Sequence, residues 1–228
     1  MKQIIEVLFI ACLLAGCQQE TELLTDGNTG YLMLSSVKAK NDFLVQPGTR
    51  TVDPEFQLEI CNPTSGTPLH TFHPGELTQQ KIQLEVGSYL LKAYTPNHEQ
   101  TWGNGVKGEA QYYKEQRFDI NANQVNVVSV QVPMKNCAVT LRLPAEFDSW
   151  FTEYTFTVTQ GSNGQERNVT LKNGETAYLT SDLDFSYSLA AKNHDDELQV
   201  TSGKVSAPVA NTEYELTYSL STVTLKQR

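Results

Sequence analysis

The sequence predicts an all-β protein built from two β-sandwich domains in tandem. Three observations support this fold class. Apolar and polar residues alternate along much of the chain, turn-forming residues separate the alternating stretches, and one half of the chain resembles the other. Beyond the first seventeen residues, we find no stretch with the 3.6-residue spacing of an amphipathic helix.

The alternating stretches are candidate strands with one buried face, since successive side chains of a strand point to opposite sides. In chain order they lie at 31–38, 56–60, 89–93, 124–132, 139–143, 154–158, 187–191 and 214–220. Turn signals such as Asn62-Pro63 and Asn173-Gly174 fall between them. The run Leu84–Leu91, with a Gly87-Ser88-Tyr89 step, predicts a hairpin of the kind found in transthyretin-like and immunoglobulin-like sandwiches.

An internal repeat appears at an offset of 98 residues. The matched pairs are Phe56 with Tyr154, Tyr89 with Tyr187, Leu91 with Leu189, Phe118 with Leu216 and Ile120 with Tyr218. The repeat predicts two domains of ordinary sandwich size that join near residues 133–136.

The first seventeen residues, MKQIIEVLFIACLLAGC, predict a secretion signal. A short apolar run ends in Leu14-Ala15-Gly16-Cys17, which resembles the bacterial lipobox; Glu6 departs from the usual apolar run. The resemblance implies cleavage before Cys17 and attachment of acyl chains to it, including a palmitate. The alternative is an ordinary secretory signal that is cut elsewhere.

Residues 18–29 are polar and contain glycine, so we expect a tether between the lipid and the folded part. No other apolar stretch approaches the length of about 20 residues that a spanning helix needs. The predicted segments are therefore a signal peptide at 1–16, a lipidated tether at 17–29, a first sandwich at 30–135 and a second at 136–228.

The charge balance argues against nucleic-acid partners. The chain has 17 basic and 26 acidic residues and a formal net charge of −9. Affinity for nucleic acid depends mainly on basic residues that displace counterions from phosphates. We expect no nucleic-acid partner.

The order of these features resembles a lipoprotein family of Bacteroides and its relatives, of the type called domain of unknown function 4493. The resemblance rests on the lipobox, Gly30–Leu34, Thr49-Arg50, Phe56–Ile60 and the later strands in this order. These proteins are similar in plan to fimbrillins, which are two-sandwich subunits of pili. The resemblance implies an outer-membrane, cell-surface location and no established chemistry.

Fimbrillins assemble after an arginine-specific protease removes their first strand, and a strand of the next subunit fills the groove. By resemblance, Arg50 is a candidate processing site, because it follows the first candidate strand. The terminal run Thr222–Leu225 is a candidate donor strand for such strand addition. The alternative is that Arg50 is a loop residue and the C-terminus is an edge strand.

The segment 95–117 is the candidate binding loop, because Trp102, Tyr112 and Tyr113 lie among glycines and amides. Exposed aromatic rings stack on sugars or anchor protein partners. The alternative is that these rings cap the ends of the sandwich cores.

The sequence indicates no catalytic residues, metal ligands or cofactor. Gly103–Gly108 matches G-x-G-x-x-G but lacks the strand and helix that a dinucleotide site needs. His70 and His73 lack further ligands nearby, Asp119–Gln124 departs from a calcium loop, and 193–197 is as well explained by a hairpin tip as by cation binding. We expect no enzymatic activity. A hydrolase that lacks any recognisable catalytic motif is the least favoured hypothesis.

Two cysteines remain after processing and lipidation, Cys61 and Cys137. An extracytoplasmic compartment permits a disulfide, and two buried thiols are the alternative. The sequence therefore predicts a surface lipoprotein with a structural or adhesive role. Its alternative role is a module that binds a glycan or a protein through loop 95–117.

Overall fold

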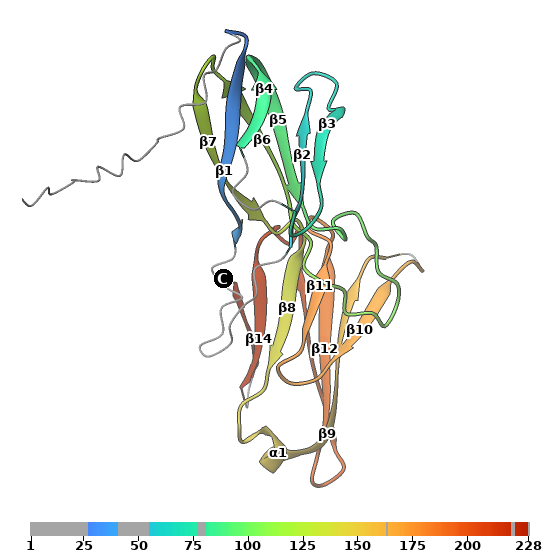
Figure 1. The fold of residues 1–228 in the computed structure, drawn as a ribbon. Helices are drawn as coiled ribbons and strands as arrows, with labels where there is room; N and C mark the ends of the chain where they lie inside the picture. Colours follow the sequence, from blue (N-terminus) through green and yellow to red (C-terminus); the bar gives the residue numbers. More distant parts are fainter. Residues whose placement is uncertain (1–26, 41–54, 77–80, 163, 220–221, 228) are drawn as a thin grey trace, which may run out of the picture.

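The computed structural model describes residues 27–40, 55–76, 81–162, 164–219 and 222–227. Within these ranges the chain is almost entirely β, so the predicted fold class is confirmed (Figure 1). The lipobox and Arg50 lie outside the described residues.

The elements of the first sandwich are seven strands: β1 (Thr29–Lys40), β2 (Gln57–Cys61), β3 (Pro68–Phe72), β4 (Lys81–Glu85), β5 (Gly87–Tyr94), β6 (Tyr113–Ile120) and β7 (Val125–Pro133). A three-stranded sheet of order β4-β1-β7 packs against a four-stranded sheet of order β3-β2-β5-β6. β1 is antiparallel to β4 and parallel to β7, so it is the central strand of its sheet.

The second sandwich repeats this plan with β8 (Cys137–Arg142), β9 (Phe151–Gln160), β10 (Arg167–Leu171), β11 (Thr176–Leu179), β12 (Phe185–Asn193), β13 (Leu198–Val205) and β14 (Glu213–Ser219). It adds a short helix, α1 (Phe147–Trp150), and a terminal strand, β15 (Thr222–Gln227). The sheet orders are β10-β9-β12-β13 and β11-β8-β14-β15.

The two sandwiches share one topology, which explains the repeat in the sequence. Strands β1 to β7 correspond in order to β8 to β14, including the parallel pairs β1–β7 and β8–β14. Tyr89 and Leu91 on β5 match Tyr187 and Leu189 on β12, and all four side chains are buried. β15 has no counterpart among the described strands of the first sandwich.

One part of the predicted repeat is wrong. Phe118 and Ile120 lie on β6, which corresponds to β13, whereas Leu216 and Tyr218 lie on β14. Alternating strands superimpose on one another at any even offset, so the sequence pattern alone did not separate these two pairings.

The predicted hairpin at 84–91 is a crossover between sheets. β4 ends at Glu85 in the three-stranded sheet, and β5 begins at Gly87 in the four-stranded sheet. The Tyr89 hydroxyl donates a hydrogen bond to the Glu85 carbonyl over 2.9 Å, and its ring stacks on Phe118. The tyrosine therefore holds the corner where the chain changes layers.

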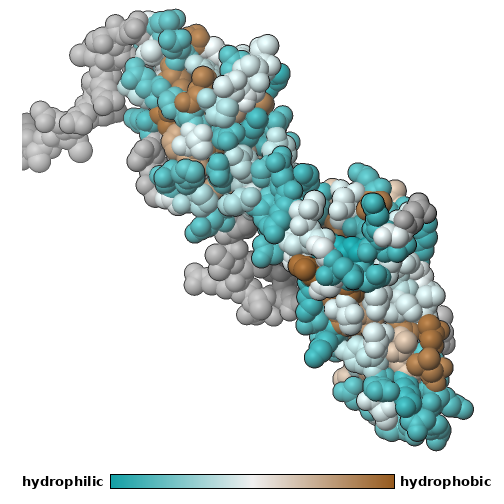
Figure 2. Space-filling view, turned by 90° about the vertical axis from the view of Figure 1, so that its right-hand side faces the viewer, coloured by the Kyte–Doolittle hydropathy of each residue, from teal (hydrophilic) through white to brown (hydrophobic). Residues whose placement is uncertain are grey.

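Each sandwich has its own core. One cluster includes Leu32, Ile60, Leu91 and Val130, and the other includes Phe156 and the facing strands of the second sandwich. Burying such side chains contributes about 1.5–3 kcal/mol each. The face drawn in Figure 2 is correspondingly mostly hydrophilic, with hydrophobic atoms in small separate areas.

Cys61 and Cys137 are both buried and free, so they form no disulfide with each other. Burial raises the pKa of both thiols, and that of Cys137 to about 12. The two thiols act as small apolar core residues.

Candidate functional site

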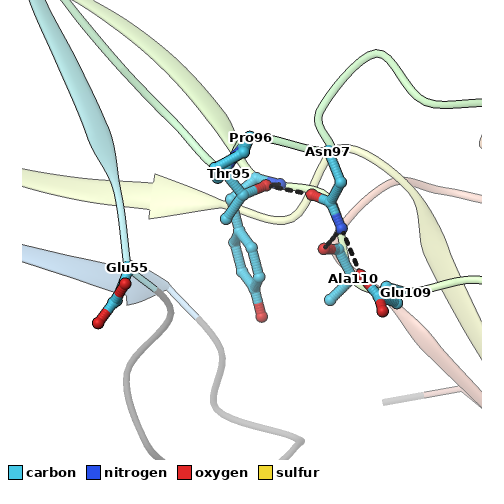
Figure 3. Close-up of a pocket in the computed structure, with 7 residues that line it drawn as sticks. Glu55, Thr95, Pro96, Asn97, Glu109 and Ala110 are labelled. Carbon is cyan, nitrogen blue, oxygen red and sulfur yellow. Dashed lines mark hydrogen bonds between the residues drawn. The ribbon is translucent and has the colours of Figure 1, made fainter. Parts of the chain in front are cut away.

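A pocket of about 480 Å³ opens beside the ends of the predicted binding loop (Figure 3). Its lining comes from a residue two positions before β2, from the start of the loop and from the end of the loop. The lining residues are Glu55, Thr95, Pro96, Asn97, Glu109, Ala110 and Tyr112. The pocket therefore depends on two loop ends that are brought together across the sheet.

A chain of hydrogen bonds holds the walls of this pocket. Thr95 Oγ1 donates to Asn97 Oδ1 over 2.7 Å, and Asn97 Nδ2 donates to Glu109 Oε2 over 3.0 Å (Figure 3). Asn97 Nδ2 also contacts the Ala110 carbonyl at 3.3 Å. Asn97 therefore ties the start of the loop to its end.

Among the described residues that line the pocket, the charged side chains are those of Glu55 and Glu109. The pocket also presents the apolar surfaces of Pro96 and Ala110. Carboxylates accept hydrogen bonds from hydroxyl and ammonium groups, whereas they repel anions. The arrangement is suited to a neutral polar or cationic ligand.

Two buried amides that the sequence analysis missed set the position of the loop. Gln111 Nε2 donates to the carbonyls of Asn97 and Gln100 over 2.7 and 2.6 Å. Asn136 Nδ2 donates to the Glu109 carbonyl over 2.9 Å, and its Oδ1 accepts from the Gln111 backbone N–H over 3.1 Å. The sequence placed Asn136 in the predicted joint between the domains, but it did not indicate which groups this side chain would hydrogen-bond.

The middle of the loop crosses to the second sandwich. The N–H of Gly105 donates to the carbonyl of Asn168 on β10 over 2.8 Å, and the N–H of Tyr178 on β11 donates to the Lys107 carbonyl over 2.8 Å. Lys107 also forms an ion pair with Glu175 at 2.6 Å. β10 and β11 are edge strands of different sheets, so residues 102–108, which we term the strap, bridge both edges.

Arg167 anchors the strap. Its guanidinium donates to the carbonyls of Tyr178 and Val106, and its Cζ lies 5.9 Å from the ring centroid of Trp102. The buried Nε has no hydrogen-bond partner among the residues that the structure describes, and burial lowers the pKa of the guanidinium. A charged side chain so placed forms charge-assisted bonds in a low-dielectric setting.

Two glycines of the G-x-G-x-x-G match allow the backbone conformation and the close packing of the strap. Gly105 and Gly108 have φ of +77° and +76°, which glycine adopts without steric cost. A Cβ on Gly108 would lie 3.0 Å from the Trp102 ring. The motif therefore has a local packing role in this fold.

The predicted binding residues do not converge on one surface. Trp102 is half-buried against Arg167, and Tyr112 is a core residue with 3% exposure. Tyr113 is half-buried on β6 and stacks on His98. The loop is also shorter than the predicted 95–117, because β6 begins at Tyr113.

The side chains at 193–197, which were considered for cation binding, form hydrogen bonds and an ion pair within their hairpin. Asn193 Oδ1 accepts hydrogen bonds from the backbone N–H groups of Asp195 and Glu197, and Asp196 pairs with Lys192 at 2.9 Å. The part of the chain that the structure describes contains no group of three or more histidine, cysteine or carboxylate side chains placed to hold a metal. Nor does any helix in those ranges have the length and apolar character to cross a membrane.

Comparison with known proteins yields one family and several related folds. Residues 28–227 match the model of a domain of unknown function (DUF4493). No curated protein matches the chain. A "putative cell adhesion protein" from Bacteroides uniformis ATCC 8492 is 11% identical, with a TM-score of 0.52 over 89% of this chain and 98% of its own.

Two further solved structures are similar at lower scores. A "putative cell adhesion protein" from Bacteroides eggerthii DSM 20697 is 8% identical, with a TM-score of 0.47 over 90% of this chain and 96% of its own. A "fimbrial assembly protein" from Parabacteroides distasonis ATCC 8503 is 12% identical, with a TM-score of 0.45 over 88% and 94%. At such identities, the likeness to the B. uniformis protein shows a shared fold.

Proposed function

The chain belongs to the DUF4493 family, and on that premise we propose that it is a lipid-anchored protein of the outer membrane and cell surface with a structural or adhesive role. The lipobox that ends at Cys17 and the polar tether at 18–29 support the anchor. The acidic balance of the chain favours solubility outside the membrane.

The observation that carries this proposal is the strap between the sandwiches. Residues 102–108 bond to β10 and β11, one edge strand of each sheet of the second sandwich, which lies end to end with the first (Figure 1). A loop that is hydrogen-bonded to both edges limits rotation at the joint. A stiff, elongated body is suited to hold a surface away from the membrane or to transmit force.

The anchor is tested by substituting Cys17→Ala in cells that are fed labelled palmitate. We expect the label on the wild-type protein and its loss from the variant, which should leave the membrane fraction. Cys12→Ala, inside the predicted signal, is the matched control and should keep the label. Persistent labelling of the Cys17→Ala protein would contradict the proposal.

A finer form of the proposal is a fimbrillin-like subunit, anchor or accessory protein that assembles by strand addition. β1 supports it, because this central strand precedes the candidate processing site Arg50 and contributes Leu32 to the core. Its loss would leave β4 and β7 without their shared partner. β15 (Thr222–Gln227) pairs with β14 in the same chain. This pairing corresponds to the alternative hypothesis, in which the C-terminus is an edge strand.

The second candidate function is a surface module that binds a glycan or a protein, and the pocket beside the loop favours it. Glu109→Gln removes one charge yet keeps an oxygen to accept from Asn97. On a glycan array, we expect this variant to lose the signal of the wild type. Glu99→Gln, on the same loop and with an 81% exposed side chain, should keep it. Equal signals from both variants would contradict a role for the pocket.

A further inference from the structure

Apolar side chains gather at the end of the first sandwich where the described chain begins. Val86, Val125 and Val127 are 43%, 44% and 58% exposed. Tyr31 and Met33 beside them are half-buried. These five residues, here called the apolar face, lie at the start of β1, at the start of β7 and just after β4. β1 and β7 begin at the end of the molecule that is remote from the second sandwich (Figure 1).

The strand register explains why four of these side chains share one surface. Tyr31 pairs with Val125 and Met33 with Val127 on the parallel strands β1 and β7. Residues of opposite parity, such as Leu32 and Val128, point into the core. The four therefore lie on the outer surface of the three-stranded sheet.

Val86 joins this surface through the residue that precedes β1. The Val86 N–H donates to the Asn28 carbonyl over 2.8 Å, and the Tyr31 N–H donates to the Gln124 carbonyl over 2.8 Å. The crossover at Val86 and the turn before Val125 therefore lie beside residues 28–31, where the described chain enters β1.

The charge on this outer surface differs from that of the whole chain. Register places Lys81 beside Met33, Glu85 beside Thr29, Lys38 beside Gln131 and Lys40 beside Pro133. Lys81 and Glu85 therefore flank the apolar face, whereas Lys38 and Lys40 lie at the other end of β1. Beside the apolar face itself the charges of Lys81 and Glu85 balance, so contact with a lipid surface rests on the apolar side chains.

We propose that the apolar face rests on the lipid surface to which Cys17 is attached. The inference depends on the proposed anchor, because residues 18–28 span at most about 40 Å when extended and lead directly to this face. The acyl chains and the apolar face would act as two membrane signals, which together bind more firmly than one.

The test uses the mature chain, residues 17–228, coupled through the Cys17 thiol to a maleimide lipid. Cys61 and Cys137 are buried and should not react. Vesicles of phosphatidylethanolamine and phosphatidylglycerol with a diazirine lipid are irradiated, and lipid adducts are mapped by mass spectrometry. We expect adducts on peptides that contain Val86, Val125 and Val127.

The matched control is a second apolar pair, Leu198 and Val200 on β13, which are 67% and 60% exposed. We expect several-fold fewer adducts there. The double variant Val125→Ser/Val127→Ser should lose most adducts on the first sandwich, whereas Leu198→Ser/Val200→Ser should not.

Equal labelling of both pairs, or no labelling of either, would overturn the inference. So would cross-links between the apolar faces of two copies, since these would assign the face to self-association. Chemical coupling supplies the anchor in this experiment. Absence of lipid on Cys17 in cells would therefore contradict the proposed function without altering this readout.

Discussion

The guanidinium of Arg167 lies 5.9 Å from the ring centroid of Trp102, and this pair joins the first sandwich to an edge of the second. The two residues are far apart in sequence and lie in different sandwiches. The same guanidinium bonds to the carbonyls of Val106 and Tyr178, so it contacts both the strap and β11.

Arg167→Ala should lower the free energy of unfolding by about 2 kcal/mol, because it removes charge-assisted hydrogen bonds and a cation–π contact. It should also uncouple the sandwiches. Denaturant unfolding followed by circular dichroism and by tryptophan fluorescence should give separate transitions in the variant. Arg117→Ala is the control, since the Arg117 side chain is exposed on β6 and its guanidinium donates to the Pro63 carbonyl. Coincident transitions and an unchanged midpoint for Arg167→Ala would refute the role of the strap.

Asn136→Ala should destabilise the protein by about 1–3 kcal/mol, because it leaves the Gln111 N–H and the Glu109 carbonyl without a partner at a site that is 2% exposed. Chemical denaturation measures the change. Asn121→Ala loses only an exposed bond to Asn126 and should change stability by less than about 0.5 kcal/mol. Equal effects of the two substitutions would show that the Asn136 network contributes little.

Stability should fall at high pH through Cys137. Burial raises its folded pKa to about 12, from an ordinary value of 9.0. The unfolded thiol therefore ionises first, so the contribution is fully present below about pH 9 and is lost as pH rises toward 12. Each pH unit within this window costs about 1.4 kcal/mol.

The measurement compares the wild type with Cys137→Ala by denaturant unfolding at pH 8 and pH 10.5. The wild type should lose more stability than the variant over this interval. Tyrosine and lysine titrations are common to both proteins and cancel in the comparison. A pH-independent difference between the two would count against a buried neutral thiol.

Cleavage after Arg50 tests assembly by strand addition. Limited treatment with an arginine-specific protease should release β1 and yield ladders of oligomers on size-exclusion chromatography, because β4 and β7 would then accept a strand from another copy. Arg50→Ala should remain intact and monomeric under the same treatment. A cleaved chain that stays monomeric would argue against this assembly mechanism.

Much of the fold was predictable, because a half-buried strand needs apolar residues at every second position. Leu58 and Ile60, and likewise Leu189 and Ala191, show this spacing and are buried in the structure. The pairing of strands was less predictable. Phe118 and Leu216 have similar local patterns, yet β6 of the first sandwich corresponds to β13 of the second and not to β14, which carries Leu216.

The candidate site was predicted only in part. The sequence pointed to the loop that begins at Thr95, and the ends of that loop line the pocket. It did not indicate that Tyr112 enters the core or that Trp102 meets Arg167. Glu55 reaches the same pocket from before β2, which no local pattern reveals.

The sequence by itself determined the strand pattern and the turns between strands, because each depends on residues that are neighbours in the chain, and it predicts a lipid anchor at Cys17. Tertiary structure alone decided the crossover between Glu85 and Gly87, the destination of the strap and the surface on which Val125 and Val127 lie. Those features depend on partners distant in sequence, whose hydrogen bonds and burial arise only when the two sheets and the two sandwiches meet.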